Sequence, residues 1–243
     1  MFMKKVLWTT EDDRSIDYFY DWEKHYYEKE HTPTEADVVY FRDPFNNLNF
    51  APDPKALDAI ITSYQGARSI DNIHSFQDIE RYEDKYRQFE KYGSLMPKTW
   101  LATKRGFITG KNIAKPRISQ RARNVLFELD RKIDDNWIIQ ERMDIKEELR
   151  IYIVFGEIQR VATIKSSKQT GKVKVIDERL LSEEEYRFSE KVAALTDLDF
   201  AGIDVAILKN GLLRLIEVNR SPQFKRYTEI TGINLADEIS KHL

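Results

Sequence analysis

The 243-residue chain contains no cysteine, and its four histidines lie far apart in the sequence. The absence of cysteine excludes disulfide bonds, thiolate nucleophiles and zinc or iron–sulfur sites built on cysteine. The spacing of the histidines excludes a HExxH-type metal site. No apolar run approaches the ~20 residues that span a bilayer, and the N-terminal segment lacks the apolar stretch of a signal peptide. We therefore expect a globular, cytoplasmic protein that does not bind membranes.

Charge of neither sign dominates, since 39 Lys and Arg stand against 41 Asp and Glu, for a formal net charge of −2. Such a chain has no overall field that draws it to nucleic acid or membranes. Residues 1–60 nevertheless carry 13 acidic and 7 basic side chains, whereas residues 104–125 carry seven basic and no acidic ones. An anionic ligand is expected at the basic stretch. Because Phe107 is its only aromatic residue, stacking on nucleic-acid bases is disfavoured there.

The first third of the chain alternates between strand and helix patterns. Short apolar runs at residues 5–9, 37–42 and 59–64 are typical of buried parallel strands. Between the first two, residues 14–31 carry aromatic side chains every fourth position, which predicts a helix with one aromatic face. Together these segments predict a small βαβ layer.

Strand patterns dominate the remainder, with fewer helices. Ser75 is a candidate N-cap for a helix that runs to about Tyr92 and ends at Gly93. Further helices are expected at residues 182–195 and 233–242. Strands are expected at residues 107–116, 137–143, 149–155, 158–166, 203–208 and 212–218. The last two strands are joined by Lys-Asn-Gly, a hairpin signal, and the fold class is mixed α/β (α+β).

The most informative polar residues lie on this hairpin. Glu217 and Asn219 point to one side of their strand because side chains alternate, and Asp204 lies on the strand paired with it. Neighbouring strands are ~5 Å apart, so the three side chains can converge. Three hard oxygen ligands suit Mg²⁺, with Mn²⁺ as an alternative ion. The other interpretation is that they are solvent-facing residues at a strand end.

The hairpin sequence IDVAILKNGLLRLIEVNRSPQF resembles the closing motif of the ATP-grasp superfamily, nearest to RimK-type and glutathione-synthetase-like carboxylate–amine ligases. The resemblance implies that Asp204, Glu217 and Asn219 hold the magnesium ions that bridge the nucleotide phosphates. It extends over roughly residues 70–243, and its specificity lies in the order and spacing of several motifs. It implies a pre-ATP-grasp α/β domain at residues 1–74 and an ATP-grasp domain at 75–243, with a lid at about 97–140 and a metal-bearing part at 141–243.

Four further motifs carry the same resemblance. The helix that contains EDKYRQFEKYG and the strand NIAKP are similar to the family segments that present phosphate-binding lysines. WIIQERM is similar to the strand that surrounds adenine, and EELRIYIVFG to the hairpin with a ribose-binding acid and an arginine two residues later. The residues implied are Lys85 and Lys115 for phosphate, Gln140, Glu141, Arg142 and Met143 for adenine, Glu148 for ribose, and Arg150.

Two segments depart from the family pattern. After the KP pair the family usually has a glycine-rich phosphate loop, whereas residues 117–125, RISQRARNV, contain no glycine. Arginine side chains in this loop can replace backbone donors or bind a different anion. RimK-type ligases also carry an Arg and an Asn after the later hairpin, and Lys165 is the candidate to replace that Arg.

The resemblance implies an ATP-dependent carboxylate–amine ligase that uses ATP and Mg²⁺ and proceeds through an acyl phosphate. Arg150 and Lys115 would take catalytic roles, because a planar fork and a compact cation both stabilise phosphoryl oxygens. The substrates would be a small carboxylate and an amine, or a peptide or protein terminus, and a homodimer is common among relatives. Two alternatives are an ATP-grasp kinase for a hydroxyl or polyanionic substrate and a non-catalytic nucleotide-binding or nucleic-acid-binding protein.

Overall fold

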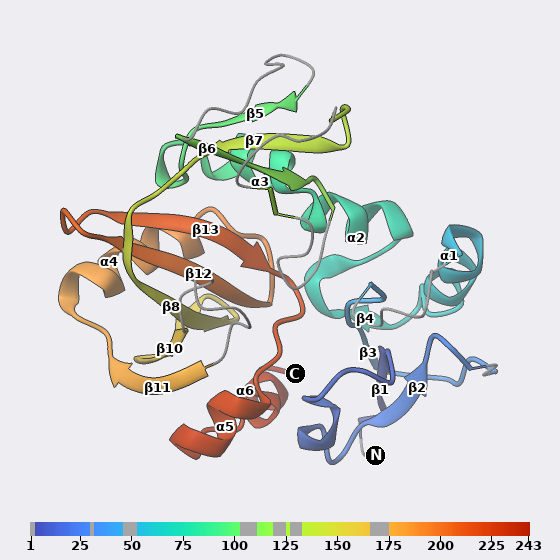
Figure 1. Ribbon diagram of the computed structural model, residues 1–243. Coiled ribbons are helices and arrows are strands. Elements are labelled where there is room, and N and C mark those ends of the chain that lie inside the picture. Colours follow the sequence, from blue (N-terminus) through green and yellow to red (C-terminus); the bar gives the residue numbers. More distant parts are fainter. Residues whose placement is uncertain are drawn as a thin grey trace.

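Three β-sheets and six α-helices make up the described part of the chain in the computed structural model (Figure 1). The structure describes residues 3–29, 32–45, 53–102, 111–118, 125–126, 133–165 and 175–243. Among these residues, no helix has the length and apolar character that crossing a membrane requires.

The N-terminal sheet contains only parallel strands in the order β2-β1-β3-β4. Its strands are β1 (Lys5–Thr9), β2 (Glu23–Tyr26), β3 (Val38–Phe41) and β4 (Arg68–Ser69). Strands β1 and β3 confirm the two predicted at residues 5–9 and 37–42, and both are buried almost throughout, as their continuous apolar runs require.

The helix predicted at residues 14–31 is wrong. Its described part forms a 3-10 turn at Ile16–Tyr18 and then strand β2. In β2, His25 is paired with Trp8 and stacks on its ring at 4.9 Å. Packing against β1 thus overrides the four-residue spacing of the aromatics.

The strand predicted at residues 59–64 is also wrong, because residues 54–62 form helix α1 (Pro54–Thr62). Asp53 caps this helix by accepting a hydrogen bond from Lys55 N, and Pro54 occupies its first turn. Leu57 and Ile61, four residues apart, are its buried side chains. An apolar run this short is compatible with either a strand or a helix, and the cap decides for the helix.

The helix predicted between Ser75 and Gly93 is present but broken in two. Ser75 forms the expected cap of α2 (Phe76–Glu83), and Gly93 ends α3 (Lys85–Tyr92). Between them Asp84 has an extended backbone and accepts hydrogen bonds from Tyr86 N and Arg87 N. This second N-cap places Lys85 at the first position of α3.

A small antiparallel sheet, β5-β7-β6, lies at the top of Figure 1. Its strands are β5 (Thr99–Leu101), β6 (Asn112–Pro116) and β7 (Trp137–Glu141). Strands β6 and β7 fall within the predicted segments 107–116 and 137–143. Most of the glycine-free loop after β6 lies outside the described residues.

The largest sheet has six strands in the order β11-β10-β8-β12-β13, with β9 paired to β8. These are β8 (Ile145–Val154), β9 (Glu157–Ile158), β10 (Val161–Lys165), β11 (Val175–Leu180), β12 (Phe200–Leu208) and β13 (Leu213–Asn219). The predicted β12–β13 hairpin is confirmed, and Gly211 in its turn has φ +86°. Helix α4 (Glu183–Ala193) packs its apolar side chains on one face of this sheet, which leaves the other face for polar residues.

Helices α5 (Lys225–Thr231) and α6 (Leu235–Lys241) follow β13 and lie beside the N-terminal sheet (Figure 1). One buried cluster joins Leu7 and Val38 of that sheet with Tyr152 and Phe200 of the large sheet and Leu235 of α6. The N-terminal layer and the end of the large sheet therefore share a core.

Candidate active site

One row of polar side chains crosses four neighbouring strands of the large sheet, on the face opposite α4. Arg150 of β8 is paired with Thr163 of β10 and with Asp204 of β12, and Asp204 is paired with Glu217 of β13. Directly paired residues on adjacent strands share a face, so these four residues form one row, here called the polar row. Two of the three predicted metal ligands are thus adjacent.

Asn219, the third predicted metal ligand, lies on the same face at the end of β13. It is paired with Gly202, two residues along β12 from Asp204. The Asn219 side-chain nitrogen donates a hydrogen bond to the Gly202 carbonyl at 3.3 Å. Because the nitrogen of Asn219 is engaged in this way, its side-chain oxygen is the atom that could bind a metal or solvent.

Asp204 is the most strongly engaged member of the polar row. Arg150 donates to both of its oxygens, from Nε at 2.7 Å and from Nη2 at 2.9 Å, and Lys165 Nζ approaches to 2.6 Å. Burial alone would raise the pKa of Asp204, but Arg150 and Lys165 outweigh it and hold the pKa below its usual range. Lys165 also lies 2.6 Å from Glu148. The predicted ribose ligand and the predicted substitute for the family arginine therefore belong to one charge network.

The donor set fits a magnesium ion. Asp204, Glu217 and Asn219 supply two carboxylates and an amide oxygen, all hard donors, and the low pKa of Asp204 keeps that ligand ionised. Within the described ranges, no group of three or more His, Asp or Glu residues is arranged to hold a metal. With these three residues as its protein ligands, an ion bound here would take its remaining positions from water and phosphate, as Mg²⁺ commonly does.

Lys85 and Lys115 lie on different elements, whose ends are joined by a backbone hydrogen bond. The Lys85 N–H at the start of α3 donates to the Arg117 carbonyl at 2.9 Å, two residues beyond Lys115 on β6. The Arg117 guanidinium pairs with Asp84 and reinforces the contact between the start of α3 and the end of β6. Arg117 is the one arginine of the glycine-free loop that can be placed, since Arg121 and Arg123 lie outside the described residues.

Lys115 is buried, and its direction is set by a glutamine. Its Nζ donates to Gln140 Oε1 at 2.7 Å, and Gln140 Nε2 in turn donates to Thr99 Oγ1 at 3.0 Å. Gln140 was assigned from the sequence to the adenine surroundings, whereas its side chain in this structure orients Lys115.

The other three adenine candidates border a cavity. Glu141, Arg142 and Met143 line a space of about 390 Å³ together with residues of the β12–β13 hairpin. Arg214 of that lining is paired with Ala206, which is paired with Glu148. The cavity therefore opens on the same sheet face as the polar row, and its volume is typical of a small-ligand pocket.

Glu83 is a buried carboxyl group at this site that the sequence does not single out, because it ends an ordinary amphipathic helix. Burial and the nearby Asp43 and Glu217 raise its pKa, while Arg220 and Lys85 partly oppose the rise. The charges of Lys85, predicted to bind phosphate, and of Glu217, predicted to bind the metal, thus both influence this one carboxyl group.

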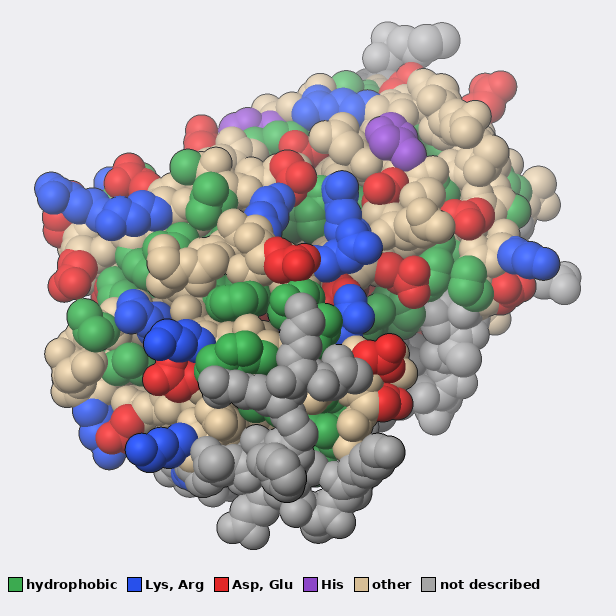
Figure 2. Space-filling view, turned by 90° about the horizontal axis from the view of Figure 1, so that it is seen from above, with side chains coloured by type: hydrophobic (Ala, Val, Ile, Leu, Met, Phe, Trp, Pro, Cys, Tyr) green, Lys and Arg blue, Asp and Glu red, His purple; other side chains and the backbone are tan. Residues whose placement is uncertain are grey.

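The surface over the small sheet shows no large field of one sign on its described part. Figure 2 views this face from above, and its blue and red side chains are interspersed with apolar ones. Binding of an anionic ligand here depends on individual cations rather than on a general positive surface.

Comparisons with known proteins agree with this geometry. The model of the RimK-like ATP-grasp domain family matches residues 74–243. A curated protein from Haemophilus influenzae (strain PittEE), "Probable alpha-L-glutamate ligase", is 28% identical over 103 residues, which cover 40% of this chain and 34% of that protein. The matched region thus spans about a third of the length of that relative.

Several solved structures share the fold over nearly the whole chain. D-cycloserine synthetase DcsG superposes with a TM-score of 0.69 at 13% identity, covering 98% of this chain and 99% of its own. The ATP-grasp ligase PsnB complexed with minimal precursor gives 0.66 at 16% identity and full coverage of both chains. The macrocyclase MdnB from Microcystis aeruginosa MRC gives 0.65 at 16% identity, covering 99% of each chain. The predicted α/β ATP-grasp fold is confirmed.

Proposed function

The chain belongs to the RimK-like ATP-grasp family, and we propose that it is an ATP-dependent ligase that joins a carboxylate to an amine. The observation that carries this proposal is the polar row: Arg150, Asp204 and Glu217 are paired side by side on adjacent strands. Phosphoryl transfer depends mainly on positioning and on charge stabilisation, and this row concentrates both kinds of charge on one rigid sheet face.

In this proposal ATP lies along the sheet face that carries the polar row, from residues 141–143 to the end of β13. The cavity beside Glu141–Met143 receives adenine, Glu148 contacts ribose, and Lys85 and Lys115 neutralise phosphate oxygens. Gln140 keeps Lys115 aimed by accepting its hydrogen bond. Mg²⁺ held by Asp204, Glu217 and Asn219 would supply charge neutralisation for the transferring phosphoryl group.

The reaction has two steps and needs no protein nucleophile. An oxygen of the substrate carboxylate attacks the γ-phosphorus, the bond to the β-phosphate oxygen breaks, and ADP leaves an acyl phosphate behind. The amine nitrogen then attacks the acyl carbon, phosphate leaves, and the nitrogen loses a proton to give the amide. Arg150, whose planar guanidinium is held by Asp204, would stabilise oxygens of the acyl phosphate. The absence of cysteine is consistent with this scheme.

Amino acids or peptides are the substrate class that the relatives support. One relative is named a probable alpha-L-glutamate ligase, and a structure of PsnB is of its complex with a precursor peptide, PsnA2, and AMPPNP. The acceptor pocket would form between the polar row and the acidic N-terminal layer, since that layer packs against the end of the large sheet, next to the polar row.

ADP release in the presence of paired substrates tests the proposed function. We expect release that requires ATP, Mg²⁺, a carboxylic acid and an amine together, screened with amino acids and short peptides. Glu217→Gln should lower the rate at least about a hundredfold while the fold is retained, because one charged ligand is lost. Glu184→Gln on the exposed face of α4 is the matched control and should act like wild type.

Two results would point elsewhere. Release of ADP with a single hydroxyl or polyanionic acceptor and no amine would identify a kinase. Nucleotide binding without turnover for any acid and amine pair would identify a non-catalytic protein.

A further inference from the structure

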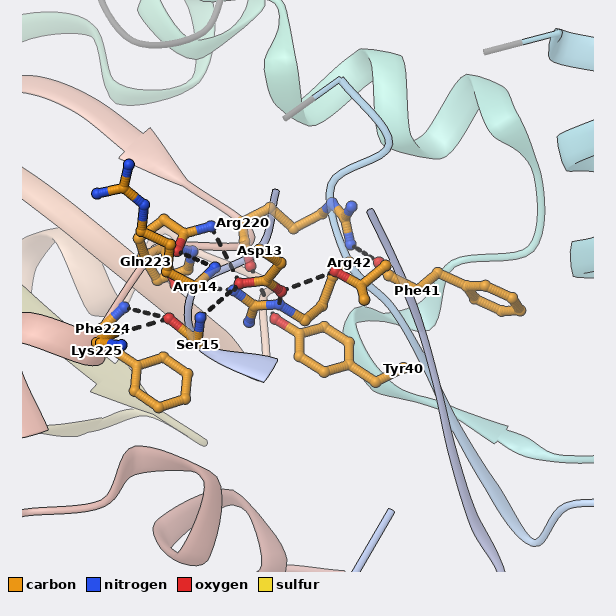
Figure 3. A network of polar contacts seen from close by, with 12 residues as sticks. Asp13, Arg14, Ser15, Tyr40, Phe41, Arg42, Arg220, Gln223, Phe224 and Lys225 are labelled. Atoms are coloured by element: carbon orange, nitrogen blue, oxygen red, sulfur yellow. Dashed lines mark hydrogen bonds and ion pairs between the residues drawn. The ribbon is translucent and has the colours of Figure 1, made fainter. Parts of the chain in front are cut away.

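The segment that follows β13, residues 220–225, is held from outside by the N-terminal layer; it is called the closing turn here (Figure 3). Gln223 donates to Asp13 Oδ1 at 3.0 Å and accepts a hydrogen bond from Arg14 N at 3.0 Å. Ser15 Oγ accepts from Phe224 N at 2.7 Å and from Lys225 N at 3.3 Å. The loop after β1 therefore fixes the second half of the closing turn.

Two buried arginines fix the first half. Arg42, at the end of β3, donates to Asp13 from Nε at 2.5 Å and to the Pro222 carbonyl from Nη2 at 3.0 Å. Arg220 donates from Nη1 to the Phe41 carbonyl and lies 3.8 Å from Asp71. Arg42 of the N-terminal layer thus donates to a carbonyl of the closing turn, and Arg220 of the closing turn donates to a carbonyl of the N-terminal layer. This contact region between the two is called the junction here, and Figure 3 shows both side chains in it.

This arrangement is a costly way to join two layers. The side chains of Arg42 and Arg220 are 1% and 0% exposed. Arg42 Nη1 and Arg220 Nε and Nη2 find no hydrogen-bond partner among the described residues. Buried ion pairs generally stabilise less than well-packed apolar residues do, and unpaired buried donors weaken them further. What guanidinium groups add is a fixed direction, because their donors form a rigid planar fork.

The closing turn is linked to Asn219, one of the predicted metal ligands, by a short series of contacts. Arg220 directly follows Asn219, the last residue of β13. Pro222, whose carbonyl Arg42 holds, packs so closely on Gly202 that a Cβ added there would lie 2.6 Å from Pro222 Cβ. Gly202 is in turn the pairing partner of Asn219 and accepts its side-chain hydrogen bond. The closing turn is therefore connected to Asn219 in two ways, directly along the chain and through the contact of Pro222 with Gly202 of β12.

We propose that Arg42 and Arg220 are positioning residues, which hold the closing turn so that Asn219 and Glu217 keep the geometry of a shared metal site. The inference rests on the proposed function, since it assigns these arginines a role toward the ion and not toward the fold alone. The role proposed for the two arginines involves no contact with the substrate or the ion. Their loss affects the site through the end of β13.

Magnesium affinity in the ADP complex, measured by calorimetry with Mg²⁺ as titrant, tests this proposal without turnover. Arg220→Met should weaken Mg²⁺ binding at least about tenfold, the scale on which outer-shell groups act. Arg220→Lys, which keeps the charge but not the planar fork, should give an intermediate value. Melting temperature is recorded for each variant, so that loss of stability is separated from loss of affinity.

Arg179→Met is the matched control. Arg179 pairs with Glu147 and Glu185 at 2.7 and 2.6 Å, so this change removes two carboxylate partners, one more than the loss of either junction arginine removes. It is paired with Ala162, a neighbour of Thr163 in β10, and so belongs to the sheet face that α4 covers. This variant should lower the melting temperature while Mg²⁺ affinity stays within about twofold of wild type.

Ser15→Ala provides a second variant that removes no buried charge. It releases Phe224 N and Lys225 N from the N-terminal loop, and it should also weaken Mg²⁺ binding. Unchanged affinity in this variant and in Arg220→Met, with melting temperatures lowered, would overturn the positioning role and leave the proposed function intact. Absence of Mg²⁺ binding to the wild-type ADP complex would overturn both.

Discussion

The buried charged side chains of the described residues include one group at the polar row and another at the junction between the N-terminal layer and the closing turn. At the polar row each buried carboxylate has a cation: Asp204 lies between Arg150 and Lys165. At the junction burial raises the pKa values of Asp71 and Glu83, although Arg220 partly opposes the rise. The surroundings of the carboxyl groups thus shift their pKa values in opposite directions at the two places.

Asp71 makes this difference measurable. Burial raises the pKa of Asp71 to about 7, although Arg220 partly opposes the rise. Because an unfolded Asp titrates near about 4, the folded state keeps a proton that the unfolded state has lost, and stability falls as pH rises from about 4 to about 7. Asp71→Asn removes this titration and retains an oxygen that can accept from Phe200 N.

Melting curves of wild type and Asp71→Asn at a series of pH values check this expectation. The melting temperature of the variant relative to wild type should increase from about pH 5 to about pH 8, at about 2–4 °C for each kcal/mol. Parallel curves across this range would show that Asp71 is already ionised in the folded protein.

Single residues of the site were predictable where one local motif fixes them. Asp204, Glu217 and Asn219 share a face because a short hairpin sets their register. Gln140 stays a predicted neighbour of adenine, and its hydrogen bond from Lys115 could not be predicted because Lys115 lies on another strand, 25 residues away in the sequence. The role inferred for Arg42 was out of reach for the same reason, since its contacts with Pro222 span 180 residues.

At the scale of elements, caps and turns decided most outcomes. Ser75, Ser182 and the Lys-Asn-Gly turn are local signals, and the two helix starts and the hairpin that they mark were predicted correctly. The aromatic spacing in residues 14–31 misled because tertiary packing against β1 determines that segment. The cap at Asp84 was hidden inside a continuous helical pattern, yet it is what brings Lys85 to the end of β6.

The contact between β12 and the closing turn yields a prediction at this scale. Gly202→Ala places a Cβ 2.6 Å from Pro222 Cβ and 3.0 Å from Pro222 Cγ, so the turn or the strand must shift. Overpacking of this kind costs about 1–3 kcal/mol, and the melting temperature should fall by several degrees.

Gly66→Ala is the control for the glycine replacement. Nothing lies within 4 Å of the Cβ that this change adds, so the melting temperature should stay the same or rise slightly. Equal melting temperatures for the two alanine variants would contradict the close contact between Gly202 and Pro222.

Each of the three sheets carries or supports part of the candidate site. The small sheet carries Lys115, the large sheet carries the polar row, and the N-terminal sheet supports the end of β13 through the closing turn (Figure 1). The ATP-grasp fold was predictable from the order of weak motifs. The division into domains at residues 1–74 and 75–243 stays a prediction, since the two parts share a buried cluster.

Thermal unfolding of wild type and Glu217→Gln with ATP and Mg²⁺, separately and together, tests the central claim of a magnesium–nucleotide site most directly. A ligand present at a hundred times its dissociation constant stabilises by about 2.7 kcal/mol, which is a readily measured shift in melting temperature. The account predicts a shift in wild type that requires both components and is clearly smaller in Glu217→Gln. No shift at millimolar ATP and Mg²⁺, or an equal shift in the variant, would contradict it.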